Sequence, residues 1–90
     1  MRVVHKFRID MPTNVVRMDS LGHPVRVAFQ TGILQLWAEV NPADAYKTDR
    51  VFHVYSTGEP IQNGDTYVGT ATNQDEFGYE YVWHVYESMN

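Results

Sequence analysis

The sequence contains no cysteine, and this absence excludes disulfide bonds, thiolate zinc sites, iron–sulfur sites and cysteine nucleophiles. It also contains no apolar run near the roughly 20 residues that a membrane-spanning helix needs. The first residues, Met-Arg-Val-Val-His-Lys, lack the apolar stretch of a secretion signal. We therefore expect an intracellular protein without a membrane segment.

The short motifs that carry chemistry in many enzymes are missing as well. The chain has no phosphate-binding loop, no His-Glu-x-x-His metal motif and no serine in a Gly-x-Ser-x-Gly turn. Carboxylates in the loops could form an acid–base pair, but loop carboxylates are more often solvated surface groups. We therefore predict a non-enzymatic protein with no catalytic residue and no cofactor.

Acidic residues outnumber basic ones, and the net charge of −4 disfavours a nucleic-acid backbone as the partner. The two signs are unevenly placed. Residues 1–30 contain five basic and two acidic residues, whereas residues 31–90 contain two basic and nine acidic residues. If the two ends of the chain lie side by side in one sheet, these charges neutralise each other. Otherwise they leave an acidic patch that suits a basic partner protein.

The residues that are present favour β-structure, since most of the six Tyr, four Phe and two Trp lie beside Val, Ile or Thr. Alternating apolar and polar residues predict strands at 3–9, 15–18, 25–30, 33–40, 51–57, 66–72 and 79–87. Residues 42–46 supply at most one helical turn. A chain of 90 residues allows one domain. We therefore predict one all-β domain, residues 1–90, built as a small antiparallel barrel or sandwich of about seven strands.

Two glycines mark specific backbone geometry within these strands. Thr31-Gly32 predicts a hairpin with a type I turn in which only Gly32 has a positive φ, because a β-branched Thr avoids that region. Gly69 interrupts the strand at 66–72, which predicts a bulge or a close backbone approach.

A five-residue pattern occurs twice in the chain. Val-Phe-His-Val-Tyr at residues 51–55 returns as Val-Trp-His-Val-Tyr at residues 82–86. The alternation predicts that Phe52 and Trp83 share the core face with a valine. The His and Tyr side chains then lie on an opposite, half-wet face.

Three of the four histidines, His5, His53 and His84, fall in predicted strands. Three imidazoles from adjacent strands could form an open zinc site. None of these strands has the His-x-His spacing that places two imidazoles on one face. We therefore predict no metal site and interpret the histidines as hydrogen-bonded or interface residues.

Candidate binding residues come from two Thr/Gly segments and from nearby aromatic residues. Backbone N–H groups beside glycine, together with hydroxyls, can hold an anion, and aromatic walls can stack on a base. Both glycines could equally serve only the backbone geometry of a turn and a bulge. The candidates for a ligand or partner are Trp37, Tyr55, Thr57, Gly58, Gly69, Thr70, Trp83 and His84.

The aromatic residues near the end of the chain also predict self-association. Tyr79, Tyr81 and Trp83 share one face of a strand, so they belong either to the core or to a contact with another subunit. A small all-β chain must also cover its edge strands. We therefore expect a homodimer.

Five segments resemble, in the same order, a family of small proteins of unknown function encoded by bacteriophages and prophages. Members often have Gly-Thr-Gly where this chain has Ser-Thr-Gly, at 56–58. The resemblance spans nearly the whole chain and transfers no catalytic residue. The segments are His5-Lys6-Phe7, Leu36-Trp37-Ala38-Glu39-Val40, Ser56-Thr57-Gly58-Glu59-Pro60-Ile61, Tyr67-Val68-Gly69-Thr70 and Val82-Trp83-His84-Val85-Tyr86-Glu87.

The resemblance implies a phage-encoded protein that acts in the cytoplasm of the bacterial host. We expect a binding protein, with a host protein as the partner and counter-defence as a role. One alternative is a protein that sequesters a small nucleotide used as an immune signal. A lesser alternative is a structural component of the virion. Each assignment is an analogy.

Overall fold

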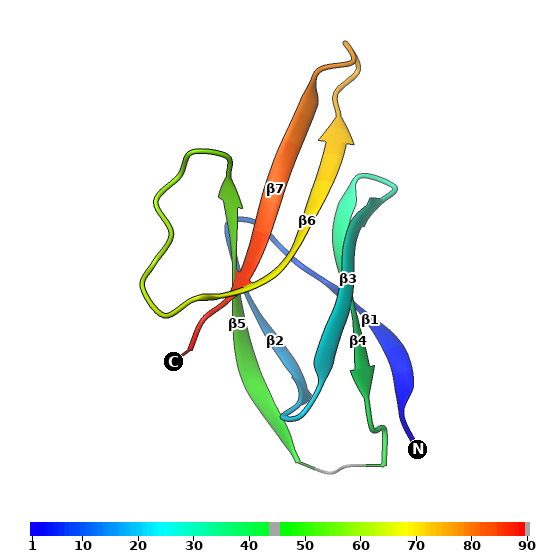
Figure 1. The fold of residues 1–90 in the computed structure, drawn as a ribbon. Helices are drawn as coiled ribbons and strands as arrows, with labels where there is room; N and C mark the ends of the chain where they lie inside the picture. The colour runs from blue at the N-terminus through cyan, green and yellow to red at the C-terminus, as the bar shows by residue number, and fades with distance from the viewer. Residues whose placement is uncertain (44–45, 90) are drawn as a thin grey trace.

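The computed structural model describes residues 1–43 and 46–89, which form strands joined by turns and loops (Figure 1). This confirms the all-β prediction of about seven strands, with a sandwich-like arrangement rather than a closed barrel. The strands are β1 (Val3–Arg8), β2 (Thr13–Asp19), β3 (His23–Gln30), β4 (Ile33–Val40), β5 (Lys47–Ser56), β6 (Thr66–Gln74) and β7 (Glu80–Glu87).

The strands form two antiparallel sheets. The three-stranded sheet has the order β1-β4-β3, and the four-stranded sheet has the order β2-β5-β7-β6. The first and last strands therefore lie in different sheets, and the expectation that the two ends of the chain neutralise each other in one sheet is wrong. Each sheet instead combines strands from both portions of the sequence, since β2 lies in the four-stranded sheet and β4 in the three-stranded sheet.

Alternation in β4 places every second side chain in the core, as the sequence pattern predicts. Leu34, Leu36, Ala38 and Val40 are buried, whereas the residues between them are half-buried. The four-stranded sheet contributes the facing half of the core through Phe52, Val54, Ala71 and Val85. Burying one large apolar side chain stabilises the fold by about 1.5–3 kcal/mol.

The two sheets approach most closely where β3 packs against β6. The pairing register of β6 shifts between Tyr67 and Gly69, which confirms the predicted bulge. A Cβ on Gly69 would lie 2.7 Å from Cγ2 of Val27, so the predicted close approach is also confirmed. Glycine at this position lets the backbone of one sheet contact a side chain of the other.

The β3–β4 hairpin differs from the prediction at its turn. Gln30 pairs with Ile33, so the loop has two residues, and Thr31 has φ +48° beside Gly32 at +79°. The prediction that Thr31 avoids positive φ is wrong. A two-residue loop needs positive φ at both positions to match the twist of the strands, and this requirement outweighs the preference of threonine. The Thr31 hydroxyl donates to the carbonyl of Gln30 at 2.7 Å.

Four strands, β2, β3, β5 and β6, extend beyond their predicted limits. β2 and β5 pair from Thr13 with His53 to Asp19 with Lys47. The added residues are mostly polar, so the apolar alternation does not reveal them. The helical turn considered at 42–46 includes Asp44 and Ala45, which lie outside the described residues. In the described part of the chain, no helix has the length and hydropathy to cross a membrane.

Candidate functional site

The repeated pentapeptides lie on adjacent strands of the four-stranded sheet. β5 and β7 run antiparallel with Val54 opposite Val85, and both valines are buried. The antiparallel direction places His53 opposite Tyr86 and Tyr55 opposite His84. The two repeats therefore present imidazole and phenol rings on the outer face of the sheet, as their alternation predicts.

A chain of hydrogen bonds crosses this outer face from β6 to the loop after β5. The Tyr67 hydroxyl lies 2.7 Å from Oγ1 of Thr70, which lies 3.1 Å from Nδ1 of His84. Nε2 of His84 lies 3.0 Å from Oγ1 of Thr57. We call Tyr67, Thr70, His84 and Thr57 the hydroxyl row. Three of its members are residues that the sequence predicts as candidates.

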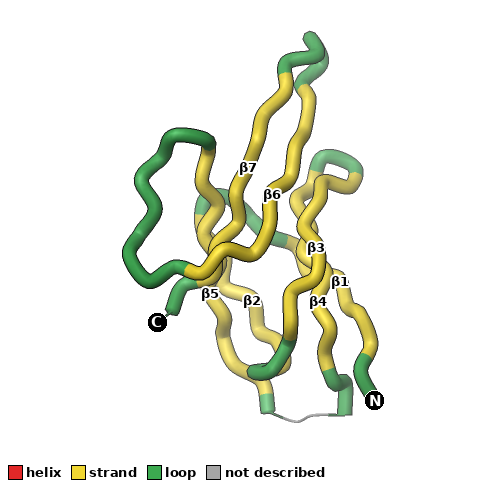
Figure 2. The backbone as a smooth tube through the Cα atoms, in the orientation of Figure 1, coloured by secondary structure: helices red, strands yellow, loops and turns green. Residues whose placement is uncertain are grey.

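The loop at 57–65 joins β5 to β6 (Figure 2). Its residues cover one of the predicted aromatic walls, Tyr55. Tyr55 is only 8% exposed, and its hydroxyl donates to Oδ2 of Asp65 at 2.7 Å and accepts from the backbone N–H of Gln62. Burial, followed by the hydrogen bond to Asp65, raises the pKa of Tyr55. The expectation of a half-wet tyrosine is therefore wrong at this position, because the loop folds over the ring.

Gly58 sets the first turn of this loop. Its φ of +94° permits the backbone N–H of Glu59 to donate to the carbonyl of Ser56 at 3.1 Å. The Glu59 carboxylate in turn accepts from the backbone N–H and the hydroxyl of Ser56, and these bonds lower the pKa of Glu59. The turn holds Thr57 over His84. Gly58 and Gly69 therefore serve the backbone geometry of a turn and a bulge, which the sequence analysis gives as the alternative to ligand binding.

The hydroxyl row can bind a polar ligand but lacks the arrangement of a catalytic triad. Both ring nitrogens of His84 are engaged by threonine hydroxyls, so no carboxylate orients the imidazole. His53, on the same face, has Nδ1 3.0 Å from Oγ1 of Thr13, whereas His5 lies in the other sheet. Among residues 1–43 and 46–89, no group of three metal-binding side chains comes together.

The two tryptophans point in opposite directions relative to the core. Trp83 packs against the core, and its Nε1–H donates to Oδ1 of Asn73 at 3.1 Å. Trp37 lies on the outer face of the three-stranded sheet, since the alternate residues Leu36 and Ala38 are buried. The structure therefore separates Trp37 and Trp83 from the hydroxyl row, and the eight predicted residues do not form one pocket.

Basic side chains surround Trp37. In the pairing register, Trp37 lies between Lys6 on β1 and Arg26 on β3. The Arg26 guanidinium carbon is 5.4 Å from the indole centroid, a cation–π contact, and Nζ of Lys6 donates to Oε1 of Gln30 at 2.9 Å. We call the outer side of β1, β4 and β3 the Trp37 face. It carries Arg8 in the next row, opposite Gln35.

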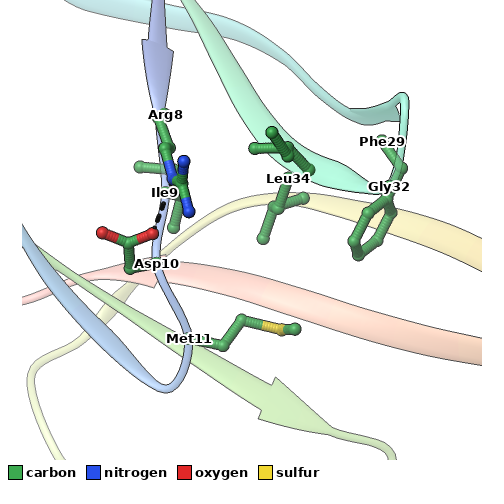
Figure 3. Close-up of a pocket in the computed structure, with 8 residues that line it drawn as sticks. Arg8, Ile9, Asp10, Met11, Phe29, Gly32 and Leu34 are labelled. Carbon is green, nitrogen blue, oxygen red and sulfur yellow. Dashed lines mark hydrogen bonds and ion pairs between the residues drawn. The ribbon is translucent and has the colours of Figure 1, made fainter.

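A pocket of about 230 Å³ opens at one end of the sandwich, beside the β3–β4 turn (Figure 3). We call it the end pocket. Ile9 and Leu34, each 2% exposed, lie at its base, and Phe29 and Met11 form its walls. Arg8 is at the rim, where its Nε donates to Oδ1 of Asp10 at 2.8 Å.

A second pocket, of about 380 Å³, lies beside Arg50 and Glu87. Arg50 donates from Nε and Nη2 to the two carboxylate oxygens of Glu87, at 2.6 and 2.8 Å. Nη1 donates to the carbonyls of Gly22 and Asp19. The hydrogen bond to Glu87 raises the pKa of Arg50 against the effect of partial burial. Since all three guanidinium nitrogens are engaged, this arginine joins the β2–β3 turn to the four-stranded sheet rather than binding an anion.

The β6–β7 hairpin ends in an exposed aromatic tip. We define the hairpin tip as residues 75–81, in which Phe77, Tyr79 and Tyr81 are 77%, 69% and 45% exposed. Oδ1 of Asp75 accepts from the backbone N–H groups of Phe77 and Tyr79, and Oδ2 accepts from the Tyr81 hydroxyl. These hydrogen bonds lower the pKa of Asp75, although desolvation alone would raise it.

Sequence reasoning identifies Tyr79 and Tyr81 and considers Asp75 only as one of the loop carboxylates, but it misses Phe77. The available signal is a large aromatic residue at a turn, where polar residues and glycine are usual. It does not predict the contacts of Tyr67 and Asp65. Tyr67 bonds to Thr70 on its own strand and packs against Tyr86 of β7, and Asp65 bonds to Tyr55 across the loop.

The fold is an all-β sandwich of two antiparallel sheets, whose outer faces carry the side chains described above. The chain belongs to the family described as a domain of unknown function (DUF7352), whose sequence model matches residues 1–90. No curated protein and no solved structure gives a significant match. Membership of an uncharacterised family agrees with the kind of family that the five segments resemble.

Proposed function

We propose that the protein is a non-enzymatic binding protein and that the Trp37 face contacts a partner protein. The observation that carries this proposal is the position of Trp37, which points away from the core between Lys6 and Arg26. Tryptophan and arginine are the residues most often responsible for binding energy in protein interfaces. A sheet face is also flatter than the concave sites that bind small molecules.

The charge of the Trp37 face favours an acidic partner surface. Strands β1, β3 and β4 carry three basic residues, Lys6, Arg8 and Arg26, against one acidic residue, Glu39. Glu39 is itself 3.5 Å from Arg2. A protein with a net charge of −4 is poorly suited to binding the phosphate backbone of a nucleic acid. A carboxylate-bearing protein surface matches both the local positive charge and the indole.

The resemblance to phage-encoded proteins supports a biological setting for this binding. In this proposal the protein acts in the cytoplasm of the bacterial host, and its partner is a host protein, with counter-defence as the role. A structural role in the virion is the alternative. Genes adjacent to the coding sequence separate the two, since anti-defence genes support the first and tail or capsid genes the second.

Affinity capture tests the face directly. The immobilised protein and its Trp37→Ala variant are exposed to bacterial lysate, and the captured protein is then purified and titrated against both. We expect Trp37→Ala to weaken binding at least about 30-fold, the effect of a hot-spot residue. Val15→Ala, at an exposed position of β2, is the control. A partner that binds the Trp37→Ala variant as tightly as the parent protein contradicts the proposal.

A second candidate function is the sequestration of a small nucleotide. The observation that favours it is the convergence of Thr57, Thr70 and His84 in the hydroxyl row. A nucleotide present at 100 times its dissociation constant stabilises a protein by about 2.7 kcal/mol, which raises Tm by several degrees. Thr70→Val should abolish that shift, and Thr72→Val on the same strand should leave it. A panel of linear and cyclic nucleotides without any shift contradicts this function.

A further inference from the structure

The hairpin tip and the end pocket lie at the same end of the molecule. Figure 1 shows the β3–β4 turn and the β6–β7 turn pointing in one direction, with the β6–β7 hairpin extending further. The end pocket is bounded by that same β3–β4 turn, through Gly32 and Ile33. A projecting element and a recess at one end of the molecule allow two copies related by a twofold axis to contact each other twice. In each contact the projection of one copy meets the recess of the other.

We propose that two copies of this chain associate by inserting each hairpin tip into the end pocket of the other copy. Phe77 enters the recess formed by Met11 and Phe29 above Leu34, and Glu76 faces Arg8. The contact uses neither the Trp37 side chain nor the hydroxyl row, although it shares Arg8 with the Trp37 face. Trp37→Ala therefore tests partner binding alone, and Phe77→Ser tests this association alone. Binding of a partner can fail while this association persists.

The size of the end pocket suits an aromatic ring. A cavity of about 150 Å³ is large enough to hold benzene. The end pocket measures about 230 Å³, and its base consists of the buried apolar residues Ile9 and Leu34. Met11, 45% exposed on the wall, is a flexible side chain that adapts to an inserted ring. Phe77 is the most exposed aromatic residue of the hairpin tip.

The charges of the two surfaces are complementary. The hairpin tip carries Asp75, Glu76 and Glu80 and no basic residue. The pocket rim carries Arg8 and its ion-pair partner Asp10, whose side chains are 64% and 57% exposed, and Lys6 adds a positive charge in the adjacent row of the same strand. Nε of Arg8 donates to Asp10, and its two Nη groups make no hydrogen bond to any described residue. They are therefore able to receive a carboxylate from a second copy.

The conformation of the hairpin tip is set before any contact forms. Asp75 accepts two backbone N–H groups and the Tyr81 hydroxyl, and Gly78 adopts a φ of +84° that closes the turn. A preformed tip loses little conformational freedom on binding, which favours association.

The exposed area requires two contacts rather than one. A buried aromatic side chain contributes about 150–250 Å², so one tip with three such residues yields a small interface. Two reciprocal contacts double this area and bring it closer to the roughly 1,200–2,000 Å² found for specific interfaces. A closed dimer is therefore favoured over a single one-way contact.

Analytical ultracentrifugation over a range of concentrations measures the association of the full chain. We expect a monomer–dimer equilibrium, and we expect Phe77→Ser to raise the dissociation constant at least about tenfold, as loss of a central aromatic anchor does. Leu21→Ser is the control, because Leu21 is 79% exposed in the β2–β3 turn at the other end of the fold. Circular dichroism establishes that both variants keep the fold.

A charge exchange makes the test specific to this interface. Arg8→Glu and Glu76→Arg should each be monomeric, since each places like charges together at both contacts of its own dimer. An equimolar mixture of the two variants should recover a dimer, because one contact is then native and the other has its charges reversed.

Three results overturn the proposal. They are a wild-type chain that stays monomeric at several hundred micromolar, a Phe77→Ser variant that dimerises as tightly as the wild type, and a mixture of the charge variants that remains monomeric.

Discussion

The outer faces of the two sheets are built on the same alternating pattern but meet solvent differently. The Trp37 face of the three-stranded sheet is lined by long charged and amide side chains around one indole. The outer face of the four-stranded sheet carries histidine, tyrosine and threonine, linked by hydrogen bonds and covered in part by the loop at 57–65. One face is open to solvent, and the other is engaged largely with its own chain.

The comparison shows that the outer face of a sheet can stabilise the fold through contacts among its own side chains. On the four-stranded sheet, ring contacts link Tyr55 to Tyr86 at 5.7 Å and Tyr67 to Tyr86 at 5.4 Å. Edge-to-face pairs of this kind add about 0.5–1.5 kcal/mol each beyond the area that they bury. On the Trp37 face the contact that involves a ring is that of Trp37 with Arg26, beside the hydrogen bond from Lys6 to Gln30 and the ion pair of Arg2 with Glu39. The proposed partner contact is placed on that face for this reason.

The two tryptophans provide the largest test of this difference. Trp83→Ala should destabilise the protein by about 3 kcal/mol, because it removes a ring that packs against the core. Trp37→Ala should cost about 1 kcal/mol or less, since the outer ring loses mainly its contact with Arg26. Urea unfolding followed by circular dichroism measures both. Equal costs would show that the Trp37 face is covered as tightly as the core.

The next largest expected effect on stability comes from removing the Tyr55 hydroxyl, which holds the loop at 57–65 over the four-stranded sheet. Tyr55→Phe should cost about 1.5 kcal/mol, because Asp65 and the N–H of Gln62 lose a buried hydroxyl partner. Hydrogen exchange should rise in the loop at 57–65 and remain unchanged in β1 and β3. Tyr79→Phe, at an exposed position, is the control. Unchanged exchange in the loop would show that the hydroxyl does not hold it.

The same tyrosine predicts a pH dependence. Since the pKa of Tyr55 is raised in the folded protein, the stability that it contributes is complete below its unfolded pKa of about 10. This stability is lost as the pH rises above that value towards the folded pKa. Urea midpoints should therefore fall more steeply above pH 10 for the wild type than for Tyr55→Phe. Parallel curves would contradict the assignment.

The smallest expected effect is a gain in stability confined to the three-stranded sheet. Thr31→Asn should stabilise the β3–β4 hairpin by about 0.5–1 kcal/mol, because asparagine tolerates the φ of +48° that threonine adopts there. Thr31→Val is the matched control and should lower stability, since it keeps the branched Cβ and lacks the hydroxyl. The thermal midpoint reports both. A loss of stability in Thr31→Asn would contradict a turn with two positive φ angles.

Much of the fold is predictable because alternation is a local property. The buried residues of β4, the bulge at Gly69 and the pairing of β3 with β4 follow from short stretches of sequence. The polar ends of β2 and β5 are not predictable in this way, because pairing with each other rather than side-chain burial defines them. The turn at Thr31 is missed because loop length overrides a residue preference.

The candidate site is only partly predictable, for a related reason. Thr57, Thr70 and His84 are identified from sequence, and the structure brings them together. Tyr55 is identified as a wall for a ligand, yet the loop at 57–65 covers it. Whether an outward side chain meets solvent or another segment depends on the path of a loop, and a loop carries no periodic signal.

The sequence by itself determined that the chain is all-β, that it is rich in aromatic residues and that its charges are unevenly distributed. These properties follow from residue composition and from short-range patterns in the sequence, so they do not depend on contacts between distant residues. Only the tertiary structure decided that the first and last strands lie in separate sheets and that Trp37 faces outward while Trp83 packs inward. It also decided that the hairpin tip and the end pocket share one end of the molecule. Such arrangements depend on how strands far apart in the chain pair, and that choice rests on the packing of the whole core.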